Sequence, residues 1–203
     1  MPWELAQGAP GKEVWMGSAN LDPVSRSYPA QYVSSWTMKY GTPVTIRPIR
    51  PEDEPLMVNF HKTLSDRTVY LRYFSSLSLS RRTAHERLFR ICTCDYQTEI
   101  VLVAEHRNPQ TAESQILGVA RLNKLATNNE AEVAGLVSDQ YQHQGLGSEL
   151  LRQLIKVAQE EKLSCLRAEM LRDNFPIQII FKRLGFRLRL LGDSASVQAI
   201  LDL

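Results

Sequence analysis

A glycine-rich turn of six residues, QHQGLG at positions 142–147, joins an apolar run at 133–137 to a segment with leucines at helical spacing. The apolar run predicts a strand, and the leucine pattern predicts an amphipathic helix that begins near Gly147. Glycines let the backbone take positive φ and come close to a ligand, and a helix start offers unpaired N–H groups and the positive end of its dipole. The turn is therefore expected to bind an anion such as the pyrophosphate of a nucleotide.

Two other phosphate-binding turns also place glycines between a strand and a helix. A P-loop requires a Lys-Ser/Thr pair after the glycines, and Gly147 is followed by Ser148 and Glu149. A dinucleotide-binding turn needs a third glycine where this chain has Leu150, although Glu169 lies at a suitable distance for its acidic residue. That fold also needs several further βα units, for which the chain has little room. A turn without a ligand is the remaining alternative.

Residues 137–151, VSDQYQHQGLGSELL, resemble the acyl-CoA-binding motif of the GNAT acetyltransferase superfamily. A second segment, Asn174 followed by FKRLGF at 181–186, is similar to the closing segment of the superfamily. Two motifs in this order and at this separation are more specific than one. The resemblance implies an α/β fold with a mixed, mostly antiparallel sheet of about seven strands flanked by helices. It also implies acetyl-CoA as the acyl donor and no metal.

A narrower resemblance extends upstream of the turn. It rests on GTPVTIRPIRPEDE at 41–54, VYLRYF at 69–74, and Asp95-Tyr96 before the apolar run at 99–104. These segments are similar to the acetyltransferase domain of bacterial protein lysine acetyltransferases, which is often fused to an acyl-CoA synthetase-like module. The resemblance implies acetyl transfer to an exposed lysine of a protein partner, for which an acyl-CoA synthetase is one candidate. The chain is either a free-standing relative or the catalytic domain alone.

The resemblance assigns the coenzyme to the turn and to the strand before it. A backbone N–H near Leu136 or Val137 would stabilise the oxyanion of the tetrahedral intermediate, and the same strand edge would pair with the pantetheine amides. Asn174 has two alternative roles, a hydrogen bond to the pantetheine arm or a cap on the following helix. The turn residues expected to hold the coenzyme are Gln142, His143, Gln144, Gly145, Leu146, Gly147 and Ser148.

Glu132, at the start of the strand that leads to the turn, is the expected catalytic base. A lysine with a pKa of about 10.4 is protonated at neutral pH, and removing its proton costs roughly 4 to 5 kcal/mol. In the lysine acetyltransferases that this chain resembles, a glutamate stands at the matching position. The apolar neighbours Val133 and Leu136 are expected to raise the pKa of its carboxyl. From the residues alone, a solvated glutamate at a strand end, close to Glu130, is the alternative.

The acceptor is expected beside the segment at 69–74. Tyr70, Arg72 and Tyr73 lie where the resemblance places the acceptor side, as does Asp95-Tyr96. Buried aromatic residues with an ion-paired arginine are the alternative interpretation. A small amine or a polyamine is the alternative acceptor to a protein lysine.

Phe181 stands where superfamily members often have a tyrosine that serves as the acid for the departing thiolate. A thiol with a pKa of about 8.5 leaves readily as a thiolate, so losing the acid is expected to cost less than losing the base. The substitution keeps a second hypothesis open, a non-catalytic acyl-CoA sensor or partner-binding module. Direct transfer in a ternary complex is expected, because none of the cysteines lies in the turn or in the Glu132 strand.

Length and composition predict one domain. A chain of 203 residues with 43% hydrophobic residues can bury one core. Residues 1–30 contain many glycines and prolines without periodicity and are interpreted as a linker or poorly ordered arm, and residues 31–203 as the acetyltransferase domain. Trp3 and Trp15 in the arm are expected to dock on the domain or on a partner.

Several classes of protein find no support in the sequence. No apolar run approaches the roughly 20 residues of a membrane span, and there is no secretory signal pattern, so a cytoplasmic protein is expected. Cys92, Cys94 and Cys165 are an odd number without C-x-x-C spacing, which argues against disulfides and zinc. A net charge of +2 gives no reason to expect nucleic-acid binding. The oligomeric state is not predicted.

Hydrophobic periodicity and turn residues predict the order of the elements. Strands are expected at 32–39, 44–47, 99–105, 115–123, 131–137 and 164–171, with two more after Phe186 that Gly192-Asp193 separates. Helices are expected at 51–64, 68–74, 81–92, 147–160 and 176–184. Two blocks of helices around a mostly antiparallel run of strands indicate a mixed α/β sheet.

Overall fold

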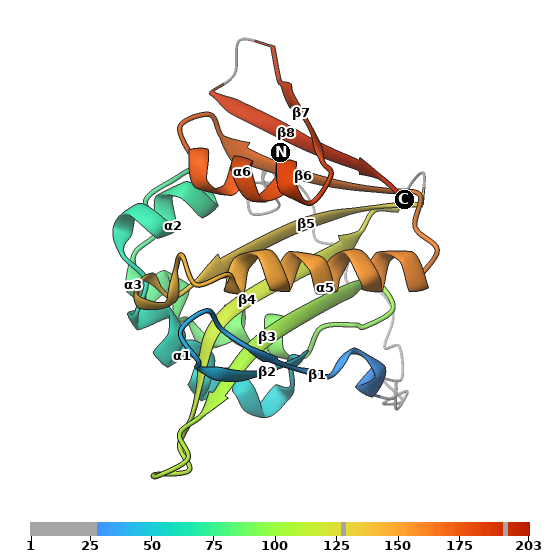
Figure 1. The fold of residues 1–203 in the computed structure, drawn as a ribbon. Coiled ribbons are helices and arrows are strands. Elements are labelled where there is room, and N and C mark those ends of the chain that lie inside the picture. The colour runs from blue at the N-terminus through green and yellow to red at the C-terminus, as the bar shows by residue number, and fades with distance from the viewer. Residues whose placement is uncertain (1–27, 127–128, 193–194) are drawn as a thin grey trace, which may run out of the picture.

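The computed structural model describes residues 28–126, 129–192 and 195–203, which form a sheet of eight strands with helices on both faces (Figure 1). The strand order is β1-β2-β3-β4-β5-β6-β8-β7, and among the described strands only β5 and β6 pair in parallel. The mixed, mostly antiparallel α/β fold is confirmed, with eight strands where about seven were expected. The strands are β1 (Ser34–Thr37), β2 (Pro43–Pro48), β3 (Glu99–Arg107), β4 (Ser114–Lys124), β5 (Glu130–Val137), β6 (Cys165–Leu171), β7 (Arg187–Leu190) and β8 (Ser196–Asp202).

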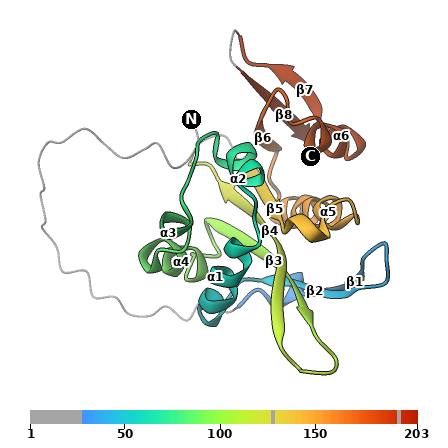
Figure 2. The same cartoon turned by 90° about the vertical axis from the view of Figure 1, so that its left-hand side faces the viewer.

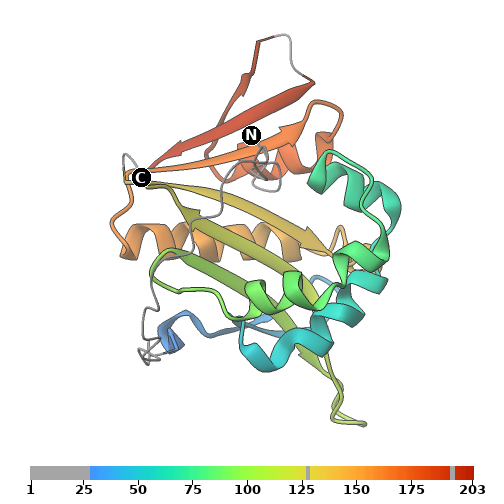
Figure 3. The same ribbon diagram turned by 180° about the vertical axis from the view of Figure 1, so that it is seen from behind.

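Helices cover the two faces of the sheet in separate groups. Figure 2 shows α1 to α4 on one side and α5 and α6 on the other, and Figure 3 shows the first group, in teal and green, from behind. Each group covers its own cluster of buried apolar side chains. The helices are α1 (Glu54–Lys62), α2 (Asp66–Tyr73), α3 (Leu79–Arg82), α4 (His85–Cys92), α5 (Leu146–Glu160) and α6 (Phe175–Arg183).

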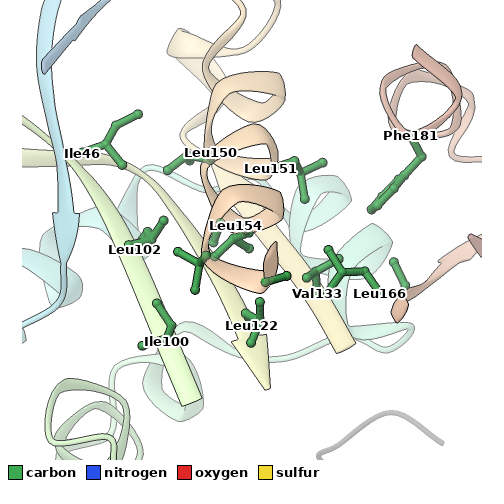
Figure 4. Close-up of a cluster of buried hydrophobic side chains, with 14 of the residues drawn as sticks. Ile46, Ile100, Leu102, Leu122, Val133, Leu150, Leu151, Leu154, Leu166 and Phe181 are labelled. Atoms are coloured by element: carbon green, nitrogen blue, oxygen red, sulfur yellow. The ribbon is translucent and has the colours of Figure 1, made fainter. Parts of the chain in front are cut away.

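Helix α5 follows the glycine-rich turn, as its leucine spacing predicts. Its apolar side chains recur every three or four residues and therefore share one face. Leu150 and Leu154 are almost fully buried and point toward Leu102 and Leu122 of the sheet (Figure 4). The helix is thus fixed along its length over β3, β4 and β5, and this fixes the position of the turn at its start.

Strands β5 and β6 are paired over only part of their length. Their register runs from Glu130 opposite Cys165 to Glu132 opposite Arg167, and no later pair is formed among the described residues. Strand β5 nevertheless continues to Val137, where it still pairs with β4. The two strands therefore separate beyond Glu132, as Figure 1 shows, and leave one edge of β5 without a neighbouring strand.

The helix expected at 81–92 is two short helices, α3 and α4. Both the backbone N–H and the hydroxyl of Thr83 donate to the Leu79 carbonyl oxygen, each at 2.9 Å. Ala84 then takes an extended backbone with ψ of 131° before α4 begins. A threonine side chain that bonds back to the preceding turn competes with helix continuation, which accounts for the break.

A buried ion pair joins β2 to the start of α1. Arg47 and Asp53, 5% and 4% exposed, form two hydrogen bonds of 2.7 and 2.8 Å, and Arg47 Nε also donates to Glu105 on β3 at 2.7 Å. Burial alone would lower the pKa of Arg47, but the bonds to both carboxylates outweigh it and raise that pKa. The charged form is therefore retained, and the guanidinium links three elements.

The described chain begins with a packed residue. The Tyr28 hydroxyl donates to the Pro48 carbonyl oxygen at 3.0 Å, and its ring meets Tyr96 edge to face. Residues 1–27 of the expected arm, with Trp3 and Trp15, lie outside the described residues. Within the described part of the chain, no helix has the length and apolar character that crossing a bilayer requires.

Leu154→Ala is expected to lower the free energy of unfolding by about 2–5 kcal/mol, because it removes a fully buried side chain and leaves a cavity beneath α5. Urea denaturation followed by circular dichroism measures the change. Lys156→Ala, at an exposed position of the same helix, is the control and is expected to change stability by less than about 0.5 kcal/mol. Equal effects of the two variants would contradict the packing of α5 described above.

Candidate active site

A large cleft opens where β5 and β6 separate. Its volume is about 930 Å³, and its walls come from β5, β6, α2, α6 and the glycine-rich turn. Glu132 to Val137 form one wall and Ala168 to Met170 the other. The cleft therefore follows from the short pairing of the two strands, and its size suits a ligand larger than a simple metabolite.

The glycine-rich turn lies at one end of this cleft with its backbone donors free. Gly145 has φ of 89° and His143 has φ of 59°. No backbone N–H from His143 to Ser148 has an acceptor among the described residues, whereas the Glu149 N–H donates to the Gly145 carbonyl oxygen at 3.0 Å. Successive N–H groups in such a turn, at the start of a helix of 15 residues, have the arrangement that favours an anion.

The hairpin of β1 and β2 supports the turn from outside. The Lys39 N–H donates to the Gln144 carbonyl oxygen at 3.2 Å. A Cβ added at Gly145 would lie 3.3 Å from the Trp36 ring, so this position requires glycine both for its positive φ and for space. Sequence reasoning did not detect this support, because Trp36 is more than a hundred residues from the turn and has no local signal.

Two polar side chains connect the turn to α2. Asp139 accepts hydrogen bonds from the hydroxyls of Ser65 (2.6 Å) and Thr68 (3.0 Å) and from the Ser65 N–H (3.0 Å). Gln142 donates from Nε2 to the Thr68 hydroxyl and to the Val137 carbonyl oxygen, both at 3.2 Å. Partial burial alone would raise the pKa of Asp139, but these hydrogen bonds outweigh it and hold the pKa below its ordinary 3.8.

Glu132 lies on the wall of the cleft, half-buried, at the last position where β5 pairs with β6. Its neighbours Ala131 and Val133 pack beneath α5, so alternation along the strand directs Glu132 to the opposite face. Glu130 lies on that face too, but Arg167 binds it through two hydrogen bonds of 2.5 and 2.8 Å. Of these two glutamates, only Glu132 lines the cleft.

Glu169 is a second carboxylate on the wall of the cleft, which sequence reasoning considered only for a dinucleotide site. On β6 its neighbours Ala168 and Met170 are buried, at 3% each, so Glu169 points to the other face of the sheet. The direction of the Glu169 side chain could therefore have been predicted from the alternation of apolar and polar residues along β6. Its relation to Glu132 depends on how β5 and β6 are placed, which the sequence does not show.

The open edge of β5 presents one of the two expected oxyanion donors to the cleft. The Ser138 N–H donates to the Leu117 carbonyl oxygen on β4 at 2.9 Å. Backbone groups alternate sides along a strand, so the Leu136 N–H also points toward β4 and the Val137 N–H points toward the gap. Val137 is therefore the better placed of the two.

The residues expected to hold the coenzyme lie together, with two exceptions. Leu146 is 1% exposed in the core, and the Gln144 side chain donates to the Gln140 carbonyl oxygen at 3.1 Å, so neither side chain lines the cleft. Their backbone N–H groups are still among the free donors of the turn. The expected residues that line the cleft are Glu132, Leu136, Val137, Gln142, His143, Gly145, Gly147, Ser148 and Asn174.

Asn174 and Phe181 line the cleft from the side of α6. Asn174 occupies the N-cap position, but its side chain makes no capping hydrogen bond, so the capping alternative is wrong for this structure. The ring of Phe181 is 3% exposed and packs edge to face on Phe186 at 4.7 Å. Position 181 therefore provides core packing and no proton donor.

The cysteines lie outside the residues that line the cleft. Burial raises the pKa of both Cys92 and Cys94 to about 12, and it also raises the pKa of Cys165. Thiols with such pKa values are poor nucleophiles near neutral pH. In the described residues, no group of three or more His, Cys, Asp or Glu side chains is arranged to hold a metal ion.

Comparison with known proteins identifies the class. Residues 44–187 match the family model described as acetyltransferase (GNAT) domain, and the chain belongs to this family of acetyltransferases. It is 28% identical over 190 residues to the acetyltransferase PA5475 of Pseudomonas aeruginosa, covering 91% of this chain and 87% of that protein. It is 33% identical over 141 residues to the acetyltransferase Pat of Mycolicibacterium smegmatis, covering 69% of this chain and 40% of that protein.

Solved structures show the same fold. The GNAT domain of S. lividans PAT superposes with a TM-score of 0.76 at 25% identity, covering 87% of this chain and all of that domain (100%). Mycobacterium smegmatis RimJ in complex with CoA-disulfide superposes with a TM-score of 0.65, covering 84% of this chain and 86% of that one. At 15% identity the second likeness concerns the fold alone.

Asp139→Ala is expected to speed hydrogen exchange of the amides in the first turn of α2, because the hydrogen bonds to Ser65 and Thr68 are lost. In the wild type, the protection from Asp139 is full above pH 3.8 and is lost as the pH falls through its lower folded pKa. Mass spectrometry of exchanged peptides measures both effects. Asp66→Ala, at an exposed carboxylate in the same turn, is the control. Equal exchange protection of these amides in the two variants would contradict the proposed role of Asp139 in holding the first turn of α2.

Proposed function

We infer that this chain transfers an acetyl group from acetyl-CoA to a primary amine, in particular the ε-amine of a protein lysine, by direct transfer in a ternary complex. The observation that carries this proposal is the continuity of one cleft, which contains the anion-binding turn, the open edge of β5 and the Glu132 carboxylate. The turn, the strand edge and the carboxylate each lie where one part of acetyl-CoA or of the acceptor amine, together the substrate pair, must be bound. Membership of an acetyltransferase family supports the reaction type.

The coenzyme would bind along the cleft from the turn to Val137. Its pyrophosphate would accept hydrogen bonds from the N–H groups of residues 143–148 at the positive end of the α5 dipole. Its pantetheine amides would pair with the unpaired edge of β5, as an additional strand would. This arrangement leaves the thioester carbonyl near the Val137 N–H, where a developing oxyanion is stabilised.

Glu132 would then accept the proton of the attacking amine. As the C–N bond forms and the C–S bond breaks, the amine proton passes to the carboxylate, directly or through water, and CoA leaves as a thiolate. Phe181 supplies no proton, so the thiolate leaves unassisted by this position. The burial of the cysteines supports direct transfer rather than an acyl-enzyme intermediate.

A protein lysine is the proposed acceptor because of the resemblance of residues 41–54 and 69–74 to bacterial protein lysine acetyltransferases. Likeness to Pat and to the S. lividans PAT domain supports the same choice. The acceptor would reach Glu132 past α2, whose Leu71 and Arg72 line the cleft. A protein with an exposed lysine, such as an acyl-CoA synthetase, is the proposed partner.

Glu132→Gln is expected to lower kcat by about 100-fold or more, because the amide cannot accept the amine proton, while the Kd for acetyl-CoA stays within about twofold. Release of free CoA, measured with bacterial acyl-CoA synthetases and with a panel of small amines, gives the rate and distinguishes the acceptors. Glu130→Gln is the matched control, since Glu130 is held by Arg167 away from the cleft. Unchanged kcat in Glu132→Gln would refute the base, and tight coenzyme binding without any turnover would favour a sensor.

Gly147→Trp is expected to weaken CoA binding by more than about 100-fold, because the indole would occupy the turn that receives the pyrophosphate. A Cβ at Gly147 meets only Val137 and Ile180, at 3.6 and 3.9 Å, so the smaller Gly147→Ala is expected to fold normally and to weaken binding less. Isothermal titration calorimetry measures both affinities, with thermal melts to check folding. A folded Gly147→Trp variant with wild-type affinity would remove the coenzyme site from this turn.

A further inference from the structure

A small side cavity borders the main cleft beneath the sheet. Its volume is about 50 Å³, and it lies between the sheet and the helices α1, α2 and α4. It shares Arg72, Val119 and the segment from Ala134 to Leu136 with the main cleft, so the two spaces adjoin at these residues. The volume exceeds the roughly 30 Å³ that a water molecule occupies in the liquid, and one carboxylate group fits it.

Basic side chains line this side cavity, and none of the described residues that line it is acidic. Arg72 and Arg87 both lie over the ring of Tyr73, at 5.2 and 5.3 Å from its centroid, and Arg87 also donates to the Tyr73 hydroxyl at 3.0 Å. Arg121 also lines the space and forms an ion pair with Glu99 at 2.6 Å. The guanidinium groups of Arg72 and Arg87 are oriented by the tyrosine, and their N–H groups are donors of the kind that bind a carboxylate.

His61 lines the same cavity from α1 and has an unsatisfied polar atom. The residue is 2% exposed, and its Nδ1 has no hydrogen-bond partner in the part of the chain that the structure describes. Burial, with the nearby charges of Arg87 and Arg82, lowers its pKa to about 3, so the ring is neutral at physiological pH. Buried polar atoms are rarely left unpaired, and an anion in the cavity would accept a hydrogen bond from Nδ1–H.

The position of the side cavity points to the acyl chain of the donor. Its lining includes Gly135 and Leu136, next to the Val137 N–H that would hold the thioester carbonyl. The acyl carbons beyond that carbonyl are therefore the part of the substrate pair nearest to the side cavity. The acceptor amine instead approaches Glu132, nearer the start of β5.

We propose that this side cavity binds the terminal carboxylate of an acyl chain, so that the enzyme uses CoA thioesters of short dicarboxylic acids, such as malonyl-, succinyl- or glutaryl-CoA. The inference rests on the proposed function, because it extends the donor class of the same site. The transfer is otherwise unchanged. The amine nitrogen attacks the thioester carbon, its proton goes to Glu132, CoA leaves as a thiolate, and the distal carboxylate keeps its bonds and its charge.

Calorimetric titration of the whole chain with CoA, acetyl-CoA, butyryl-CoA and succinyl-CoA tests the proposal without any acceptor. Butyryl-CoA matches succinyl-CoA in chain length and lacks only the carboxylate. Succinyl-CoA is expected to bind at least about tenfold more tightly than butyryl-CoA, because the carboxylate gains charge-assisted hydrogen bonds. This wild-type comparison needs no variant, so it stands even if a substitution prevents folding.

Arg87→Met is expected to reduce that succinyl-to-butyryl preference at least fivefold, whereas Arg81→Met, at an exposed position outside both cavities, is expected to leave it unchanged. Equal affinity of the wild type for succinyl-CoA and butyryl-CoA would overturn the proposal. So would a preference that appears only in turnover, for lysine peptides with an acidic neighbour, since the carboxylate would then belong to the acceptor. Failure to bind CoA itself would instead contradict the proposed function. Tight CoA binding without a preference for succinyl-CoA over butyryl-CoA would contradict this inference alone.

Discussion

The limited pairing of β5 with β6 is the constraint on which the rest of the site depends. The two strands form three residue pairs, from Glu130 to Glu132, and then separate. A fully paired β5 would have no free edge and no gap between it and β6. Because the separation begins at Glu132, the carboxylate stands at the base of the gap, and Val137 directs its N–H into it. One local loss of pairing thus creates the cleft and arranges its main groups.

The position of the glycine-rich turn is fixed by elements far from it in the chain. Helix α5 is held along its length by Leu150 and Leu154, so its first turn cannot shift relative to the sheet. Trp36 packs against Gly145 from one side, and Asp139 connects the turn to α2 on the other. A rigid turn has its N–H groups oriented before the ligand arrives, which lowers the entropic cost of binding.

Local signals predicted most of the fold. The leucine spacing of α5, the alternation of β5 and the glycine-rich turn are properties of neighbouring residues, and the structure confirms each of them. The prediction of one helix at 81–92 was wrong because the Thr83 hydroxyl donates to the Leu79 carbonyl oxygen. Hydrophobic periodicity contains no information about this side-chain hydrogen bond. The capping role considered for Asn174 was wrong because that role depends on side-chain direction, which the residue type leaves open.

The sequence by itself determined the family motif, the glycine-rich turn and the strand that carries the candidate base, because glycine conformations and helical or alternating patterns arise within a few residues of each other. Only the tertiary structure decided how those parts meet. The side cavity combines His61 from α1, Arg72 from α2, Arg87 from α4 and the backbone of β5 at Gly135. No spacing in the chain relates these residues, since their proximity results from the packing of three helices against one face of the sheet. Long-range packing therefore decided the shape and lining of this side cavity, and the sequence supplied the groups.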